Sequence, residues 1–520
     1  MTAATHETGL DGLMLAKTES VALIGTEAHL VEVEVDVGTG VPRFTIVGLP
    51  SSTVREADQR VRSAILSSSE NWPQQRITAN LAPGALRKEG THFDLPLAFG
   101  VLAASGRIPS EPLAGWIVVG ELALDGSVRP VRGTLAAAIA CRESGRRGII
   151  CPASNAVEAS LVEGIEVVPV KALRECIDWA KGTWAPDPLP TNVDRVAPVY
   201  PDMREVRGQG VAKEALEIAA AGGHNLLMCG PPGSGKTMLA SRLSGILPAM
   251  SVEESLEVTR VYSVAGILGE HAGLVTDRPF RAPHHHATLA GVIGGGTGLP
   301  RPGEVSLAHH GVLFLDELPL YRGEVLESLR VPLEAGRVRI ARSAGAVSYP
   351  ARFSLIAAMN PCPCGYNGDA KRACRCREHR REAYQSKLSG PFVDRMDLGI
   401  TLTRLTRAEL MGPPEGETSE AIRARVEAAR SRQSLRWGSS LTNASVPAGQ
   451  FRTNLNLTAE ANLELGSVID GLALTGRGVD RLLRVSRTVA DLHGSTEVTP
   501  EHLGKALSYR LQNLEGVQAA

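Results

Sequence analysis

A chain of 520 residues is too long for a single hydrophobic core and predicts about three domains. Its hydrophobic content of 43% and charged content of 21% exclude a disordered or fibrous chain. A net charge of −1 excludes binding to nucleic acid through overall charge, so any such binding must depend on local basic segments.

The first residues and the cysteines indicate the compartment. Glu7 and Asp11 lie where a signal peptide would need a basic start and an apolar core, and the longest apolar stretch, 95–104, is too short to span a bilayer. We therefore expect a cytoplasmic protein without membrane contact. In that compartment eight cysteines indicate free thiols or metal ligands rather than disulfides.

Residues 1–183 are expected to form an α+β or α/β domain. Strand-like alternation and helical spacing alternate along this part of the chain. The patterns predict strands within 20–47, on both sides of a turn at 38–42, and at 76–81 and 116–120, with helices at 52–67, 93–105 and 133–144.

Two stretches of this domain, 81–96 and 119–131, resemble the catalytic fold of Lon-type proteases. That family works with a Ser–Lys dyad. Here His92 or Asp94 stands in the neighbourhood of the serine, and Gly133-Thr-Leu135 in that of the lysine. Without nucleophile and base we expect no peptide hydrolysis, and instead a role in assembly or ligand contact. The proline-rich segment 184–201 then predicts a semi-rigid linker.

The stretch Gly230-Pro-Pro-Gly-Ser-Gly-Lys-Thr237 fits the phosphate-binding loop pattern, with an apolar strand before it and a helix-forming run after it. Such a turn aims backbone N–H groups and the positive end of a helix at one point, where the phosphates of ATP can bind. Lys236 is expected to contact the β- and γ-phosphates, and Thr237 to hold Mg²⁺. The predicted nucleotide-binding residues are Gly230, Pro231, Pro232, Gly233, Ser234, Gly235, Lys236, Thr237 and Met238.

Two further apolar runs are expected to be strands that end near this loop. The run 312–317 ends in two carboxylates, and parallel strands of a doubly wound sheet bring their carboxyl ends to the ligand. Asp316 is therefore predicted to orient Mg²⁺ and Glu317 to polarise the attacking water. The run 353–360 ends in Asn360, an amide placed to sense the γ-phosphate.

Arginines beyond these strands are candidates for stabilising the transition state. Arg395 follows a helix-like segment and could act across a subunit boundary, and Arg477 lies in a basic helix from which it could reach the nucleotide. From the residues alone, the favoured interpretation of each arginine is a solvated or ion-paired helix residue, and only the order of the motifs changes that. Arg481, Arg484 and Arg487 compete with Arg477 for the same role.

The order of phosphate loop, acidic strand, asparagine strand, arginine and helical domain is the layout of AAA+ ATPases. The chain also resembles the magnesium-chelatase-like group called YifB or ComM. The resemblance implies an AAA+ core with a doubly wound sheet at 202–405, an all-helical lid at 406–520, and a ring, expected to be a hexamer. It implies further that Arg395 acts in trans and that Arg477 senses nucleotide. The segments that carry it are 278–286, 302–309, 313–319, 358–365 and 484–492.

Cys362, Cys364, Cys374 and Cys376 form two close pairs. Four thiolates suit tetrahedral Zn²⁺, although C-x-C pairs are tighter than the usual spacing, and unmetallated thiols are the alternative. Five histidines are competing metal candidates that we expect to pack or to form hydrogen bonds instead: His284, His285, His286, His309 and His310.

The segment 334–350 alternates like a β-hairpin and carries Arg337, Arg339 and Arg342. In related ATPases such hairpins point into the channel of the ring, where arginines could bind a phosphate backbone. A Gly-rich stretch, 291–303, is expected to form a second channel loop. A further basic run is equally explained as a solvated face. Its members are Lys371, Arg372, Arg375, Arg377, Arg380 and Arg381.

Together these features predict a ring-forming ATPase that acts on DNA, with ATP and Mg²⁺ as cofactors and Zn²⁺ in the cysteine cluster. The ComM resemblance implies a helicase that promotes branch migration while single-stranded DNA is integrated during transformation. Two alternatives stay open. One is a motor that remodels a metal-inserting partner, as in magnesium chelatase, and the other is a protein-remodelling ATPase.

Overall fold

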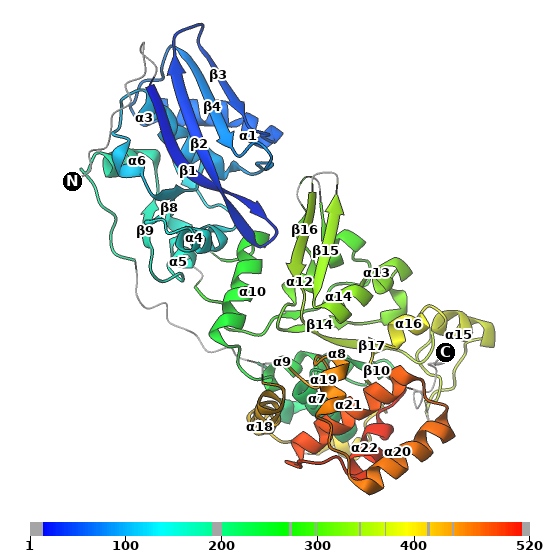
Figure 1. Cartoon of the computed structure of the whole chain (residues 1–520). Helices are drawn as coiled ribbons and strands as arrows, with labels where there is room; N and C mark the ends of the chain where they lie inside the picture. The colour runs from blue at the N-terminus through cyan, green and yellow to red at the C-terminus, as the bar shows by residue number, and fades with distance from the viewer. Residues whose placement is uncertain are drawn as a thin grey trace.

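The computed structural model describes residues 14–189, 200–269, 273–296, 298, 300–342, 345–369, 371–412, 416–438 and 441–511. Figure 1 shows an N-terminal α/β domain, a central domain around a second sheet, and a C-terminal group of helices. Within these ranges no helix is both long enough and apolar enough to cross a membrane. Parts of five expected features lie outside the described residues: the first 13 residues, 190–199 of the linker, Thr297 and Leu299 of the Gly-rich stretch, Ser343 and Ala344 at the hairpin tip, and 512–520 after the last helix.

The N-terminal domain has the strands and helices that the sequence predicts, and further ones that it does not, such as the strands at 148–152 and 166–170 and the helix at 173–180. The expected helix at 52–67 is two helices, which meet at Glu56. The elements are β1 (Met14–Ile24), β2 (Glu27–Gly38), β3 (Arg43–Val47), α1 (Ser52–Arg55), α2 (Ala57–Ser67), β4 (Arg76–Ala82), α3 (Asp94–Ala104), β5 (Trp116–Val118), β6 (Glu121–Leu122), β7 (Val128–Arg129), α4 (Thr134–Glu143), β8 (Gly148–Pro152), α5 (Ala156–Ala159), β9 (Glu166–Val170) and α6 (Leu173–Ala180).

Seven of these strands form one sheet in the order β3-β4-β2-β1-β5-β8-β9. The turn at 38–42 joins β2 to β3 as predicted, but the two strands are not neighbours, because β4 lies between them. Every residue of α3 is buried, and this helix packs against both β1 and β2. Its apolar stretch is therefore a core helix.

The central domain contains the phosphate loop and two small β-ribbons. Its elements are α7 (Gly210–Gly222), β10 (Leu226–Cys229), α8 (Lys236–Ser241), α9 (Leu243–Ile246), α10 (Val252–Ala265), β11 (Phe280–Arg281), α11 (Leu289–Ile293), β12 (Gly294–Gly295), β13 (Arg301–Pro302), α12 (Glu304–Leu307), β14 (Val312–Leu315), α13 (Gly323–Ser328), α14 (Arg330–Ala335), β15 (Arg337–Arg342), β16 (Gly345–Pro350), β17 (Ser354–Met359), α15 (Glu378–Gln385), α16 (Gly390–Val393) and β18 (Leu398–Thr401).

Its sheet is parallel throughout, in the order β11-β14-β17-β10-β18. Strands β10 and β14 are fully buried, as expected where helices cover both faces of a parallel sheet. Because all five strands run the same way, their carboxyl ends meet at one edge. That edge is where the phosphate loop begins.

Strands β15 and β16 form the predicted hairpin, which rises from the core toward the N-terminal domain (Figure 1). Val338 and Ile340 face inward and are buried, whereas Arg337 and Arg339 alternate with them and are exposed. Arg342, at the end of β15, is exposed as well. The hairpin thus presents arginines to solvent on a face that the core does not use.

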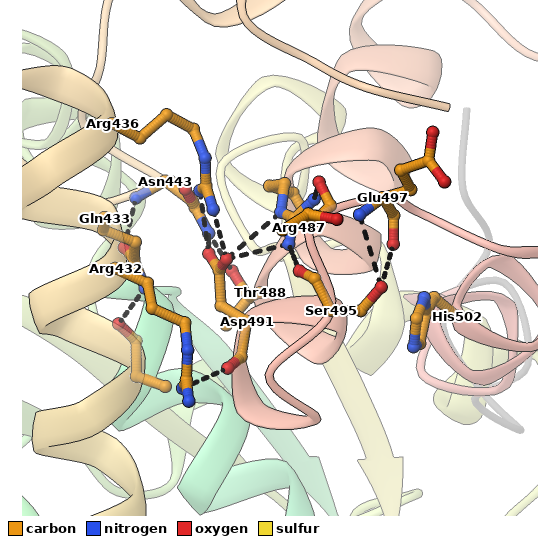
Figure 2. A network of polar contacts seen from close by, with 12 residues as sticks. Arg432, Gln433, Arg436, Asn443, Arg487, Thr488, Asp491, Ser495, Glu497 and His502 are labelled. Atoms are coloured by element: carbon orange, nitrogen blue, oxygen red, sulfur yellow. Dashed lines mark hydrogen bonds and ion pairs between the residues drawn. The ribbon is translucent and has the colours of Figure 1, made fainter. Parts of the chain in front are cut away.

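The C-terminal region is helical, with α17 (Arg407–Met411), α18 (Ser419–Trp437), α19 (Ala448–Thr453), α20 (Ala459–Leu472), α21 (Gly476–Leu492) and α22 (Pro500–Ser508). Inside it the fully buried Asp491 accepts hydrogen bonds from Arg436, Arg487 and Asn443 (Figure 2). His224, just before β10, bonds to Thr488 of α21 at 2.8 Å. This polar network joins the helical region to the base of the central sheet.

Candidate nucleotide-binding site

The loop between β10 and α8 needs glycine for steric reasons. Gly233 and Gly235 have φ angles of 78° and 90°, which side-chain-bearing residues rarely adopt. A Cβ atom on Gly230 would lie 2.8 Å from Leu402. The glycines at 230, 233 and 235 are thus each required by the conformation or close packing of this loop, and two of them, Gly230 and Gly235, are fixed positions of the sequence pattern.

Lys236 is the first residue of α8 and is only 9% exposed. Its Nζ donates to the carbonyl oxygens of Gly230 at 2.8 Å and Pro231 at 3.0 Å, and to Asn360 Oδ1 at 3.1 Å. Burial lowers the pKa of Lys236, and the nearby Asp316 carboxylate opposes that shift. The contact brings the phosphate loop and the asparagine strand together, as the sequence predicts.

Thr237 and Asp316 are in direct contact, although 79 residues separate them in the chain. The Thr237 hydroxyl donates to Asp316 Oδ2 at 2.7 Å, and the other carboxylate oxygen accepts from the Glu317 N–H at 2.9 Å. A hydroxyl and a carboxylate beside a phosphate loop are the donor set that Mg²⁺ takes in nucleotide sites. The residues therefore fit the predicted metal.

Glu317 has an unusual backbone and a partner that the sequence did not indicate. Its φ angle is 52°, in the left-handed region that costs free energy for a residue with a side chain. Its Oε2 lies 3.2 Å from His285 Nδ1. His285 follows β11, which pairs in parallel with β14, so both residues lie at the same edge of the sheet. The proximity of His285 and Glu317 therefore depends on the pairing of β11 with β14, which the sequence analysis did not predict.

Gln209 was also missed by the sequence analysis. It precedes α7 in a left-handed conformation with φ of 54°. Its side-chain amide donates to the carbonyl oxygens of Ser234 at 3.3 Å and Thr403 at 2.9 Å, so it ties this segment to the phosphate loop. A cavity of about 700 Å³, lined by Gly208 and Lys213 among others, opens beside it.

Comparison with known proteins now identifies the family. Three family models match in succession: subunit ChlI of Mg-chelatase over 33–155, magnesium chelatase subunit ChlI over 202–410, and its C-terminal part over 416–510. Competence protein ComM of Haemophilus influenzae is 43% identical over 507 residues, which cover 96% of this chain and 98% of that protein. The chain belongs to the ComM and YifB family.

The ComM and YifB relatives match this chain over nearly its whole length. The uncharacterized protein YifB of Escherichia coli is 41% identical over 508 residues, which cover 96% of this chain and 97% of that protein. Lon protease 2 of Bacillus subtilis is 31% identical over 98 residues, or 18% of this chain and 17% of the protease. The fold is therefore confirmed as a magnesium-chelatase-type AAA+ core with a Lon-like N-terminal domain and a helical C-terminal region.

In this ComM/YifB chain the candidate finger Arg395 is held within its own subunit. Its guanidinium pairs with Glu334 and donates to the Pro391 carbonyl, and its side chain is 10% exposed. It does not belong to the cluster around Lys236 in the single chain.

The four arginines of α21 differ in their surroundings. Arg487 is buried against Asp491, and Arg484 donates to the Asn443 carbonyl at 2.5 Å, so both stabilise the helical region itself. Arg481 donates to the Met396 carbonyl at 2.9 Å, next to Arg395. Arg477 is exposed at the start of the helix. All three arginines that compete with Arg477 thus already have structural partners.

The four cysteines of the cluster converge. The Sγ atoms of Cys362, Cys364 and Cys374 lie 3.4 to 3.6 Å apart, and Cys376 Sγ is within 4.8 Å of them. Thiolates around tetrahedral zinc, each 2.3 Å from the metal, would be about 3.8 Å apart. The donor set therefore fits Zn²⁺.

The cysteine segment also touches the phosphate loop. Gly365 has a φ of 83°, and a Cβ atom on it would lie 2.5 Å from Pro232 Cδ. Any movement of this loop would therefore reach the nucleotide site directly, because the Pro232 ring leaves no room for a side chain at Gly365.

His309 and His310 form hydrogen bonds, as predicted. Their Nε2 atoms lie 2.8 and 2.9 Å from Glu257 Oε2, and these contacts hold the pKa of Glu257 well below its usual value. Because the Arg352 N–H donates to His309 Nδ1 at 3.1 Å, the proton of neutral His309 is on Nε2. That nitrogen then has no lone pair for a metal, which argues against a metal site here.

In the part of the N-terminal domain where Lon-type proteases carry the catalytic serine, this chain has buried polar side chains. His92 Nε2 lies 2.8 Å from the Val21 carbonyl oxygen, and Asp94 accepts two hydrogen bonds from Arg60 at 2.7 and 2.9 Å. Both His92 and Asp94 are buried. These residues stabilise the Lon-like domain by an imidazole contact and an internal ion pair.

Proposed function

We propose that this chain is the subunit of a cytoplasmic, ATP-driven ring motor that acts on DNA. The observation that carries the proposal is the presence, in one domain, of an assembled phosphate-loop site and a hairpin with exposed Arg337, Arg339 and Arg342. The relative from Haemophilus influenzae is named a competence protein. We therefore infer branch migration or translocation of DNA strands during their integration.

In the proposed reaction, ATP and water give ADP and phosphate. Lys236 exchanges its carbonyl contacts for oxygens of the β- and γ-phosphates, and Asn360 remains beside it near the γ-phosphate. Thr237 and Asp316 would hold Mg²⁺, which neutralises phosphate charge. Glu317 polarises the attacking water. The cavity beside Gln209 has room for the adenine base.

We propose a hexameric ring with nucleotide at each subunit boundary. Arg395 would act on the nucleotide of a neighbouring subunit, and for this it must leave Glu334. Arg477, exposed at the start of α21, would sense nucleotide from the lid. We also propose that Zn²⁺ occupies the cysteine cluster, supported by the convergence of its four thiols.

A second candidate is a motor that remodels a protein partner. The match of residues 202–410 to magnesium chelatase subunit ChlI favours it. The two functions differ in what stimulates ATP hydrolysis. The test measures phosphate release by the full-length protein alone, with single-stranded, forked and four-way DNA, and with an unfolded protein, at low and physiological salt.

We expect DNA to stimulate hydrolysis at physiological salt, and replacement of Arg337, Arg339 and Arg342 by alanine to remove the stimulation while the basal rate remains. The matched control replaces three exposed arginines of the N-terminal domain, Arg43, Arg55 and Arg62. Stimulation by unfolded protein and not by any DNA would overturn the DNA motor in favour of the second candidate.

A further inference from the structure

The junction between the N-terminal and central domains contains arginines without carboxylate partners. Among the described residues, no ion pair is formed by Arg132, in the loop before α4, or by Arg301 of β13. The same holds for the hairpin arginines Arg337, Arg339 and Arg342. Many other arginines of the chain are neutralised, as Arg278 is by Glu254 and Arg281 by Glu304. Two carboxylates also lie at the junction, Glu89, which pairs with Arg87 and lies beside Gly298, and Glu158, which lines the same pocket as Arg132. The five unpaired arginines outnumber them, so the junction has a local excess of positive charge in a chain of net charge −1.

These unpaired arginines come from three elements that meet at the β12–β13 ribbon. In that ribbon Gly295 pairs with Arg301. From the hairpin side, Arg342 Nη2 would lie 3.4 Å from a Cβ atom on Gly295. From the N-terminal domain, Arg132 lies against the end of α10, which itself packs on β13, and burial together with the like charge of Arg301 lowers the pKa of Arg132. The positive charge is thus continuous from the hairpin to the N-terminal domain.

The position of Arg132 is fixed by the docking of the two domains. The Gly133 N–H donates to the Ser263 carbonyl of α10 at 3.2 Å, and Arg132 packs against Gly266 at the end of that helix. At the other end of the junction, a Cβ atom on Gly25, in the β1–β2 turn, would lie 2.8 Å from the Ser348 carbonyl of β16. Figure 1 shows this turn beside the hairpin. The N-terminal domain therefore lies directly against the elements that we propose to contact DNA.

Arginines of like charge that converge with too few carboxylates to neutralise them cost free energy, and an anion bound between them offsets that cost. A single phosphate ion would need only one guanidinium group. A row of arginines spread over three elements instead matches the repeating phosphates of a nucleic-acid backbone. We propose that Arg132 and Arg301 bind backbone phosphates of the DNA strand that the hairpin engages. The Lon-like domain, in which no Ser–Lys dyad was found, would then be part of the DNA path. This inference rests on the proposed function.

The test measures binding of a fluorescein-labelled single-stranded oligonucleotide by the full-length protein at several NaCl concentrations. Arg132→Ala and Arg301→Ala are each expected to weaken binding about 3- to 10-fold and to reduce the slope of log affinity against log salt by about 0.7. Arg132→Lys should restore most of the slope, because it restores the charge. Arg107→Ala, an exposed arginine of the same domain, is the matched control.

Three outcomes would overturn the inference. If Arg132→Ala and Arg301→Ala keep the wild-type slope while the hairpin variants lose binding, the path is confined to the hairpin. If Arg132→Ala lowers thermal stability but keeps the slope, Arg132 serves only domain docking on α10. If the unmodified protein does not bind DNA, both this inference and the proposed DNA motor fall.

Discussion

The Nδ1 atom of His285 lies 3.2 Å from the Oε2 atom of Glu317. Glu317 is the carboxylate that we propose to polarise the attacking water. While it is paired with His285, it is not available for that role. We expect His285→Ala to raise the basal ATPase rate about two- to fivefold and to reduce the additional stimulation by DNA. This expected change in rate follows because an ion pair as exposed as His285–Glu317 contributes at most about 1 kcal/mol, or about a fivefold change in rate.

Steady-state phosphate release with and without DNA measures both rates. His286→Ala is the control, because its exposed ring lies beside His285 and forms no ion pair among the described residues. A lower basal rate in His285→Ala would show that the histidine instead holds Glu317 in its working position.

Lys236 and Glu317 should separate nucleotide binding from hydrolysis. Lys236→Ala removes the ammonium beside the phosphates, and we expect loss of both ATP binding and turnover. Glu317→Gln keeps the shape of the side chain but not its charge, so ATP should bind while hydrolysis falls about 100-fold or more. Fluorescent ATP binding and phosphate release give the two readouts. Ser241→Ala on α8 is the control, and retained turnover in either site variant would contradict the roles proposed here.

The residues of this site that could be predicted from the sequence are those marked by a short stretch of neighbouring residues. The strand, the glycine turn and Lys236 are contiguous, and each acidic or amide residue directly follows an apolar run, so parallel strands must bring them to one edge. The Thr237–Asp316 contact follows from that rule although the residues are far apart in the chain.

The remainder depends on which strands are neighbours and on side-chain packing. His285 meets Glu317 because β11 pairs with β14, and no periodicity encodes that pairing. The same holds for β4, which inserts between β2 and β3. The ion pair of Arg395 with Glu334 is a contact between side chains 61 residues apart. Sequence patterns define elements, whereas contacts of this kind depend on the assembled core.

The cysteine cluster gives a metal prediction. We expect the wild-type protein to contain about one zinc ion per chain, and Cys364→Ala to lose it, because a structural zinc site needs four protein ligands and this cluster offers four thiolates. Elemental analysis of purified protein measures the stoichiometry. Cys141→Ala, a buried cysteine of the N-terminal domain, is the control. Since the cluster packs on the phosphate loop, zinc loss should also lower ATPase activity. Wild-type protein purified without zinc would contradict the assignment.

Glu158 gives a prediction on pH. It is buried at the junction with α10, where Oε2 has no hydrogen-bond partner among the described residues, and burial raises its pKa above the usual value. The unfolded chain therefore ionises Glu158 first as pH rises, so the carboxyl lowers stability above the unfolded pKa and not below it. We expect Glu158→Gln to raise the melting temperature at pH 8 and to have progressively less effect toward pH 4.5. Glu163→Gln, exposed on the same domain, should change it at neither pH.

We expect replacement of Asp491 to lower the stability of the lid more than replacement of any other carboxylate in it. It is fully buried and neutralises both Arg436 and Arg487 (Figure 2). Asp491→Asn preserves its shape but leaves two guanidinium groups with no opposing charge, which should destabilise the lid by about 3 to 5 kcal/mol. Hydrogen exchange of peptides from α21 and α22 measures the local stability.

The control for Asp491 is Asp480→Asn, which removes an exposed pair with Arg452 and should leave exchange nearly unchanged. Because Thr488 bonds to both Asn443 and His224, loosening this network should also weaken the contact of the lid with β10. We therefore expect Asp491→Asn to lower ATPase activity, whereas Asp480→Asn does not. Fast exchange confined to α21 with unchanged turnover would show that the network stabilises the lid without reaching the nucleotide site.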